Sequence, residues 1–270
     1  MSLKNWLRFV TGKKGKVGLV LGGGAARGLA HLGVLRVLKE NNLSVDFVVG
    51  TSIGSLMGAI WAADLDIDKS FKIAKGFTWK DFIDLTYKGL GLFPGKKLRQ
   101  TIDKVLGELH FSDLKIPLIV TTTDLEMGEL VLIRSGSVAE AVRASCSIPG
   151  IFSPLEIDGK LLFDGGVIEN LPVNIAREEG ADTVIAVDVG YSFLQKRPQN
   201  IIEVIYKAFM LKGEALTFYH REKADVLITP ELPGVDQMDF HKAQECLYGG
   251  MKAAEKTLPQ LNRYLNKEKI

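Results

Sequence analysis

A serine stands in the pentapeptide Gly50-Thr51-Ser52-Ile53-Gly54, after one apolar run and before another. This is the pattern of a nucleophile elbow, in which a sharp turn between a strand and a helix exposes the serine hydroxyl. Gly50 and Gly54 are small enough to let the backbone make that turn. The start of a helix also favours a developing negative charge beside it. The pattern predicts that Ser52 attacks an ester carbonyl; the alternative is a simple helix N-cap serine.

A glycine-rich turn with the sequence Leu21-Gly22-Gly23-Gly24-Ala25-Ala26-Arg27-Gly28 lies upstream of Ser52. A strand, a glycine loop and a helix in this order can also bind a dinucleotide pyrophosphate. No acidic residue ends the following strand at the required interval of about 20 residues, and the Gly-Lys-Ser/Thr of a Walker loop is absent. We therefore predict an oxyanion hole formed by the backbone N–H groups of this turn. Its expected donors are Gly23, Gly24, Ala25 and Ala26. For Arg27 two roles stay open, bracing of the loop and binding of an anionic head group.

A candidate base is Asp164, which follows a short apolar run and precedes Gly165 and Gly166. An ordinary aspartate has a pKa near ~4, so it works as a base near neutral pH only in a dry pocket or beside a closely held hydroxyl. The two glycines would let the backbone approach closely and direct the carboxylate. The alternative is an aspartate that only stabilises a turn.

Histidine decides between two kinds of site, and the chain has four: His31, His110, His220 and His241. The order Ser52, Asp164 and then His220 or His241 matches the triad of the α/β-hydrolases. That fold places several strands before its elbow, whereas here one strand clearly precedes the elbow strand. His220 ends a predicted helix and His241 begins one, both ordinary places for histidine. The sequence favours a Ser52–Asp164 dyad without histidine.

Strand-like and helix-like runs alternate along the chain, which predicts a mostly parallel sheet with helices on both faces. The expected strands are residues 16–21, 45–49, 117–122, 130–134, 161–163, 183–187 and 226–229. The expected helices are residues 29–38, 53–63, 96–106, 138–143, 201–218 and 240–258. Ser137 and Glu140 form a capping-box signature at the start of one of these helices. The predicted fold class is α/β, with three layers.

The chain has 270 residues, 46% of them apolar and 24% charged, which is enough for one large domain with a sizeable core. A net charge of +2 is too small to indicate nucleic acid as a partner. Cys146 and Cys246 form neither a disulfide framework nor a metal-site spacing, so we expect a reducing compartment and no metal or cofactor. No apolar run approaches the roughly 20 residues of a membrane span, and the N-terminus does not have the pattern of a signal peptide. These features favour a cytoplasmic location, with peripheral membrane contact left open.

We divide the chain into a basic leader, residues 1–15, and a single domain, residues 16–270. The leader contains Trp6 and Phe9 among lysines, so it is either an anchor on an anionic membrane surface or a frayed tail. Residues 64–95 are rich in aromatics. They are either a lid or wall for an acyl chain, or ordinary core helices with lysines outside.

Four motifs in this order resemble the patatin-like phospholipase family: the glycine loop with Arg27, Gly28 and His31, the Ser52 pentapeptide, residues 144–154 (ASCSIPGIFSP), and Asp164-Gly165-Gly166. The likeness covers roughly residues 16–190. It implies that Asp164 takes the proton of Ser52 directly, that the loop holds the oxyanion, and that acyl esters of lipids are hydrolysed without a metal. The chain departs from the family pattern at Ala25, where the second glycine of the loop would stand. Two further functions stay open on the same scaffold, an acyltransferase and a non-catalytic regulator.

Overall fold

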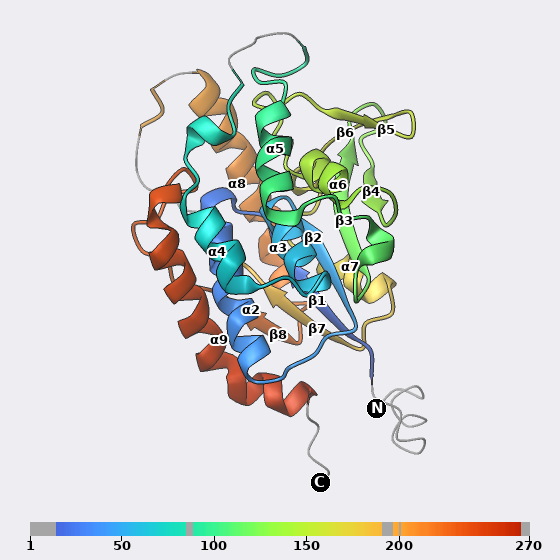
Figure 1. Cartoon of the computed structure of the whole chain (residues 1–270), viewed down its shortest axis with the longest axis vertical. Coiled ribbons are helices and arrows are strands. Elements are labelled where there is room, and N and C mark those ends of the chain that lie inside the picture. Colours follow the sequence, from blue (N-terminus) through green and yellow to red (C-terminus); the bar gives the residue numbers. More distant parts are fainter. Residues whose placement is uncertain (1–14, 85–88, 191–196, 200, 266–270) are drawn as a thin grey trace.

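The computed structural model describes residues 15–84, 89–190, 197–199 and 201–265 of the chain (Figure 1). Its centre is an eight-stranded sheet in the order β5-β6-β3-β2-β1-β7-β8, with β4 paired to β3. The strands are β1 (Val17–Leu21), β2 (Phe47–Thr51), β3 (Leu118–Asp124), β4 (Leu130–Ile133), β5 (Leu155–Ile157), β6 (Lys160–Asp164), β7 (Thr183–Val187) and β8 (Val226–Ile228).

The middle of the sheet is parallel. Strands β3, β2, β1, β7 and β8 run in one direction, while β4, β5 and β6 join by antiparallel pairing. Every residue of β1, β2 and β7 is buried, which explains why these strands are near-continuous apolar runs. Because parallel strands end at the same edge, the residues after β1 and β2 meet there.

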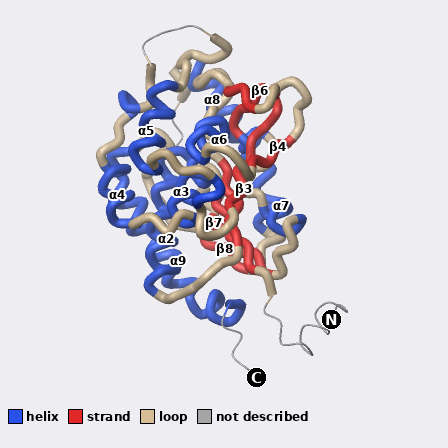
Figure 2. Tube along the Cα trace, turned by 45° about the vertical axis from the view of Figure 1, so that its right-hand side comes forward, coloured by secondary structure: helices blue, strands red, loops and turns tan. Residues whose placement is uncertain are grey.

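Helices cover both faces of the sheet, as Figure 2 shows for α7 on one side and α2, α3 and α4 on the other. The α-helices are α2 (Ala30–Glu40), α3 (Ile53–Ala62), α4 (Ile67–Lys75), α5 (Lys96–Leu106), α6 (Val138–Ser145), α7 (Val173–Glu178), α8 (Ile201–Arg221) and α9 (Ala243–Leu265). Short 3-10 turns are η1 (Ala25–Leu29), η2 (Trp79–Asp81), η3 (Phe111–Asp113), η4 (Gly165–Val167) and η5 (Phe240–Lys242).

The alternation of side chains along the strands separates two cores. On β1, Leu19 and Leu21 join the larger core beneath the helices on one face, whereas Val20 joins the smaller core on the other. The larger core takes in buried side chains of α2, α3, α6 and α9, and the smaller one those of α7. The predicted three-layer α/β class is therefore confirmed.

Some predicted boundaries were wrong. The closing helix, expected over residues 240–258, is a 3-10 turn followed by α9, which continues through Pro259 to Leu265. Proline normally ends a helix, but Leu261 and Leu265 beyond it are buried and hold the last turns against the core. The glycine loop also leads first into η1, so α2 begins one residue later than the helix predicted from residue 29.

The aromatic-rich segment is packed rather than open in its described part. The side chains of Phe71 and Phe77 are buried, and the rings of Trp79 and Phe82 pack against Phe240 with centroid distances of 5.3 and 4.9 Å. The Trp79 indole N–H also donates to the carbonyl of Met238, 2.9 Å away. These contacts favour the interpretation as core helices. Residues 1–14 of the predicted leader, residues 1–15, and residues 85–88 of the aromatic-rich segment lie outside the described residues.

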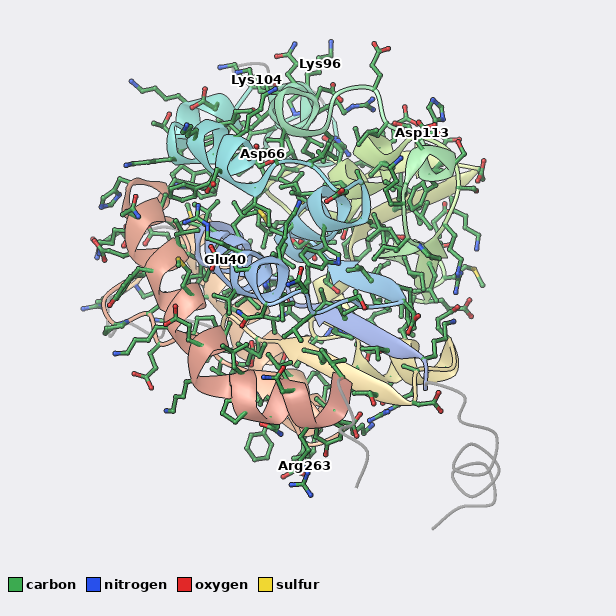
Figure 3. The ribbon with its side chains drawn as sticks, turned by 60° about the horizontal axis from the view of Figure 1, so that its bottom comes forward. Glu40, Asp66, Lys96, Lys104, Asp113 and Arg263 are labelled. Carbon is green, nitrogen blue, oxygen red and sulfur yellow. The ribbon has the colours of Figure 1, made fainter. Side chains whose placement is uncertain are left out.

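Charged side chains lie on the outer surface of the helices. Lys96 and Lys104 on α5 and Arg263 near the end of α9 are exposed and project away from the body (Figure 3). Within the part of the chain that the structure describes, no helix combines the length and apolar character needed to cross a bilayer.

Candidate active site

Ser52 occupies the turn between β2 and α3 in a conformation that is rare for serine, with φ 53° and ψ −128°. Such a backbone costs on the order of 1–3 kcal/mol and persists only where its surroundings enforce it. Here the Ser52 N–H donates to the hydroxyl oxygen of Ser145 at 2.7 Å, and that hydroxyl in turn donates to the Thr121 carbonyl at 2.7 Å. The strain therefore lies at the residue predicted to be the nucleophile.

The glycines on either side of Ser52 are needed for close packing of the backbone. A side chain at Gly54 would overlap the carbonyl of Leu21, and one at Gly50 would lie 2.6 Å from the Cα of Ser55. Gly28 packs in the same way against Ile53 at the start of α3. The turn is thus pressed against the end of β1, where the glycine loop begins.

Asp164 ends β6 opposite Thr122 of the neighbouring strand β3. Its side chain is 2% exposed, and one carboxylate oxygen accepts the Gly166 N–H at 2.8 Å. Burial raises the pKa of Asp164 to about 7, because the charged form loses its hydration. The hydrogen bonds from Gly166 and Ser52 counteract only part of this rise. A side chain at Gly165 would lie 2.6 Å from the Thr121 carbonyl, so Gly165 lets the turn after Asp164 pack onto β3.

The predicted nucleophile and base lie together. The Ser52 side chain interacts with the Asp164 carboxyl and with the Cys146 thiol, whose pKa is raised by burial so that it stays neutral. Both predicted residues line a cavity of about 20 Å³ with Gly24, Ala25 and five further residues: Ile148, Asn170, Tyr206, Phe209 and Met210. No histidine lines this cavity.

The predicted oxyanion loop supplies fewer available donors than the four expected. The Gly23 N–H donates to the Asn170 carbonyl at 3.2 Å, and the Ala26 N–H donates to the Gln237 carbonyl at 3.0 Å. Among the described residues, neither the N–H of Gly24 nor that of Ala25 donates a hydrogen bond to another backbone segment, and both residues line the cavity. Gly24 and Ala25 therefore remain as candidate oxyanion donors, whereas the N–H groups of Gly23 and Ala26 are used to hold the loop in place.

Ala25 adopts φ 47°, a left-handed conformation that glycine takes more readily. An alanine costs about 1 kcal/mol there. The alanine therefore holds a conformation in which glycine would cost less.

Arg27 braces the loop from below. Its buried guanidinium donates to four backbone carbonyls: Val189 at 2.9 Å, Gly190 at 3.1 Å, Leu232 at 3.1 Å and Val235 at 2.8 Å. Of the two roles left open by the sequence, these bonds favour bracing, because they orient the side chain toward the protein rather than toward a ligand. His31 adds a second brace, as its Nε2 lies 2.8 Å from the Gly22 carbonyl. Burial lowers the pKa of His31 to about 4, so the ring is neutral and donates that bond.

The other histidines lie elsewhere. His220 on α8 has its Nδ1 3.7 Å from the carboxylate of Glu169, and burial lowers its pKa. His241 is 73% exposed beside Asp239. The backbone of His110 forms an isolated β-bridge with Ser137, the residue just before α6. The dyad without histidine stays a prediction, which the histidine variants can test.

Asn170 is the site residue that the sequence analysis missed. It is buried beneath the glycine loop, its amide nitrogen lies 3.4 Å from the Gly23 carbonyl, and its side chain lines the cavity. The available signal was its place four residues after Gly166, beyond a 3-10 turn that carries the chain back under the loop.

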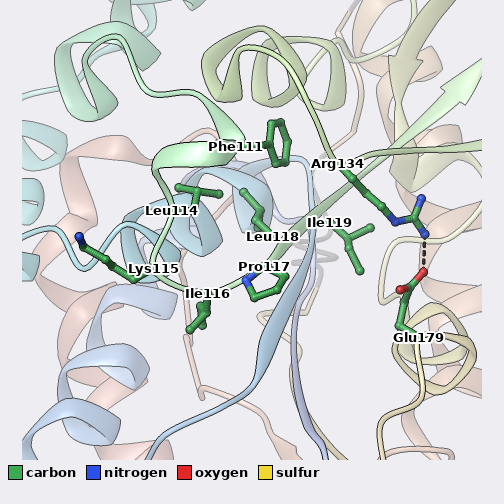
Figure 4. A pocket seen from close by; sticks show the side chains of 9 residues that line it. All are labelled: Phe111, Leu114, Lys115, Ile116, Pro117, Leu118, Ile119, Arg134 and Glu179. Carbon is green, nitrogen blue, oxygen red and sulfur yellow. Dashed lines mark hydrogen bonds and ion pairs between the residues drawn. The ribbon is translucent and has the colours of Figure 1, made fainter.

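A larger cavity of about 310 Å³ lies near the start of β3, away from the strand ends that carry Ser52 (Figure 4). Apolar side chains form most of its lining, and its Arg134 and Glu179 are paired with each other. Its lining contains no hydroxyl or thiol nucleophile. Among the described residues there is also no cluster of His, Cys, Asp and Glu able to hold a metal ion.

The protein thus has an α/β fold with a strained serine at the turn between a central strand and a helix. A model of the patatin-like phospholipase family matches residues 19–177. The chain therefore belongs to the patatin-like phospholipase family.

Several known proteins are similar in sequence to about two thirds of this chain. Identity is 39% over 180 residues with lysophospholipase NTE1 of Mycosarcoma maydis, covering 64% of this chain and 10% of the relative. It is 39% over 191 residues with neuropathy target esterase sws of Drosophila melanogaster, covering 68% and 13%. With human patatin-like phospholipase domain-containing protein 6 it is 40% over 191 residues, covering 68% and 14%. The chain thus spans only about a tenth to a seventh of these relatives.

Among solved structures, VipD from Legionella pneumophila superposes with a TM-score of 0.57 over 90% of this chain and 67% of that chain. The sequence identity is 17%, so this likeness concerns the fold alone.

Proposed function

We propose that this chain hydrolyses acyl esters of phospholipids, with lysophospholipids as the first substrates to test. The observation that carries the proposal is the strained Ser52 beside a buried Asp164 whose pKa is about 7, in one cavity with two uncommitted backbone N–H groups. The family membership and the names of the lysophospholipase relatives support the choice of substrate.

In the acylation step, the Ser52 hydroxyl oxygen bonds to the ester carbonyl carbon while its proton passes to the Asp164 carboxylate. The carbonyl oxygen becomes an oxyanion, and the N–H groups of Gly24 and Ala25 donate to it. When the carbon–oxygen bond to the leaving alcohol breaks, Asp164 returns the proton to that alcohol. An acyl-serine remains.

In the deacylation step, water replaces the alcohol. Asp164 accepts a proton from the water as its oxygen bonds to the acyl carbon, and the same N–H groups hold the second oxyanion. Collapse of this intermediate releases the fatty acid, and the proton on Asp164 restores the Ser52 hydroxyl. A buried carboxylate suits both steps, because a pKa near the working pH balances proton uptake and proton release.

The test compares Ser52→Ala and Asp164→Asn with the unmodified chain on lysophosphatidylcholine and on a water-soluble short-chain ester. Both variants should lose at least about 10³-fold in rate, as expected when a member of the reacting pair is removed. A fluorophosphonate probe should label the unmodified chain and leave Ser52→Ala unlabelled.

The matched controls are His220→Ala and His241→Ala, which should keep most of the activity. If either histidine variant stayed folded but lost its activity, the result would indicate a catalytic triad that includes this histidine instead of a dyad. Product analysis with an added lysolipid or alcohol as acceptor separates hydrolysis from acyl transfer, since a transferase would yield a new ester instead of free fatty acid.

A further inference from the structure

Asn170 lies between the glycine loop and the turn that carries Asp164. Its side chain is buried and lines the cavity that contains Ser52. A Cβ added at Gly23 would lie 2.4 Å from the Asn170 Oδ1, and one added at Gly166 would lie 2.9 Å from the same atom. The amide of Asn170 therefore fills the space between two loops, and the residue that faces it on each loop is a glycine.

Contact with Asn170 explains why position 23 is a glycine. The φ angle of Gly23 is outside the left-handed range that favours glycine, so its backbone conformation does not exclude a side chain. The next-nearest atom to the added Cβ, the Cβ of Ser52, would lie at 3.3 Å, much farther away than the Asn170 Oδ1. The residue type at position 23 is thus matched to the side chain at position 170.

Asn170 also bonds to both backbone polar groups of Gly23. Its backbone carbonyl accepts the Gly23 N–H at 3.2 Å, and its side-chain amide nitrogen donates to the Gly23 carbonyl at 3.4 Å. This carbonyl belongs to the same peptide group as the Gly24 N–H. Because a peptide group is planar and trans, its C=O and N–H point in opposite directions. The side-chain bond to the Gly23 carbonyl therefore also fixes the direction of the Gly24 N–H.

The peptide between Gly23 and Gly24 needs such an external restraint. Glycine on both sides leaves a peptide group with few steric barriers to rotation. A flipped peptide would place its carbonyl oxygen where its N–H now lies, and a carbonyl oxygen repels an oxyanion instead of stabilising it. In the described part of the chain, the Gly24 N–H has no backbone acceptor of its own that would prevent this flip.

We propose that the Asn170 side chain is a positioning residue for the oxyanion hole. By its bond to the Gly23 carbonyl, it keeps the Gly24 N–H directed as a donor during acylation and deacylation. Asn170 itself does not bond to the substrate. The inference deepens the proposed function and rests on it, because the oxyanion forms only when Ser52 attacks an ester.

The first experiment compares Asn170→Ala with the unmodified chain on a water-soluble short-chain ester. The kcat should fall about 10- to 100-fold, which is less than the roughly 10²–10³-fold loss for a donor removed outright. The KM should stay within about twofold, because the oxyanion is absent from the ground state. The matched control is Asn174→Ala, which should keep both values. Asn174 does not line the cavity, and its Oδ1 accepts a bond from the Lys223 ammonium at 2.9 Å.

The second experiment uses two inhibitors to separate positioning from substrate binding. When an alkyl trifluoromethyl ketone reacts, the Ser52 oxygen bonds to the carbonyl carbon, the Ser52 proton passes to Asp164, and the carbonyl oxygen becomes an oxyanion. The corresponding trifluoromethyl alcohol has no carbonyl carbon to attack. Asn170→Ala should bind the ketone about 10- to 100-fold more weakly and the alcohol as tightly as the unmodified chain does.

The third experiment tests the contact between positions 23 and 170 through stability. Gly23→Ala should lower the melting temperature of the unmodified chain, because the new methyl group overlaps the Asn170 Oδ1. In the Asn170→Ala background that atom is gone, so the double variant should melt at a higher temperature than the sum of the two single losses predicts. Additive losses would contradict the contact.

Unchanged kcat and unchanged ketone affinity in folded Asn170→Ala would overturn the inference. An equal loss of affinity for the ketone and the alcohol would also overturn it, since Asn170 would then bind the substrate. Failure of the proposed function has a different signature. In that case the ketone would form no adduct with the unmodified chain, and short-ester hydrolysis would survive Ser52→Ala.

Discussion

At the scale of single residues, the site depends on a conflict between burial and charge at Asp164. Removing its carboxylate from water disfavours ionisation, yet a base must be ionised before it can accept a proton. The bonds from Gly166 and Ser52 stabilise the charge only in part. A pKa near 7 is the compromise, and it makes both stability and activity depend on pH.

Replacing Asp164 by asparagine should stabilise the fold at high pH while removing activity. The pKa of Asp164 is raised from 3.8 to about 7 on folding, so its stabilising contribution is present at low pH and is lost as the pH rises through 7. Asparagine does not titrate. Between pH 4 and 7 the free energy of unfolding of the variant should therefore rise relative to that of the unmodified chain. Above pH 7 the difference should reach about 4 kcal/mol. Urea unfolding of both proteins at several pH values measures this gain, and a constant difference would contradict the buried-charge explanation.

Activity should fall on the acid side of neutrality. With Asp164 as the base, kcat/KM for a short-chain ester should drop about tenfold per pH unit below pH 7 and level off above it. Glu169 also has a pKa raised to about 7 by burial, so Glu169→Gln is the matched control and should leave the profile unchanged. A midpoint that disappears in His220→Ala would assign the profile to that histidine instead.

At the scale of elements, the glycine loop between β1 and α2 is shaped by segments distant in sequence. Gly23 bonds to the chain just before α7, Ala26 to the segment before η5, and Arg27 to the segments that follow β7 and β8. These bonds hold the loop at the cavity that Gly24 and Ala25 line together with Ser52. The loop is preorganised by its surroundings rather than by its own sequence.

Substituting Arg27 by methionine should therefore loosen the loop. Methionine keeps most of the side-chain volume but leaves three buried carbonyls and one partly buried carbonyl without their donor, which should cost about 2–4 kcal/mol of stability. If the bonds orient the loop, kcat should fall more than KM rises, since the oxyanion forms only during reaction. Arg36→Met is the control, because Arg36 pairs with the exposed Asp68 at the surface. A change in KM alone would indicate that Arg27 binds substrate.

At the scale of the whole molecule, local patterns in the sequence predicted the parallel core. The pairing of Ser52 with Asp164 was expected from the family resemblance, because Asp164 ends β6, which pairs antiparallel with β3. Buried runs such as residues 17–21 and 183–187 identify central strands, and parallel strands bring their ends to one edge. The hydrogen bonds donated by the Gly23 and Ala26 N–H groups were not predictable, since their acceptors, Asn170 and Gln237, lie more than 140 residues away. The exposed apolar side chains of α8 were equally hard to predict, because an apolar pattern does not reveal which face of a helix meets solvent.

Helix α9 lies beyond the residues that match the family model and packs against α2. A substitution at a single glycine of α9 can test whether this contact also positions the site. Helices α2 and α9 cross where Gly33 faces Leu247 and Gly250 faces Ala30, and a Cβ at Gly250 would overlap the Ala30 carbonyl oxygen. Gly250→Ala should therefore push the helices apart and destabilise the fold by about 1–3 kcal/mol.

Because Ala30 directly follows η1, the same displacement should reach Gly24 and Ala25 and lower kcat on a short-chain ester. Thermal unfolding and kcat are measured together, with the exposed Lys252→Ala on α9 as the control that should change neither. If Gly250→Ala lost stability with kcat unchanged at a temperature where it stays folded, α9 would support the fold without positioning the loop. A loss of both would show that residues far beyond the matched region hold the oxyanion donors in place.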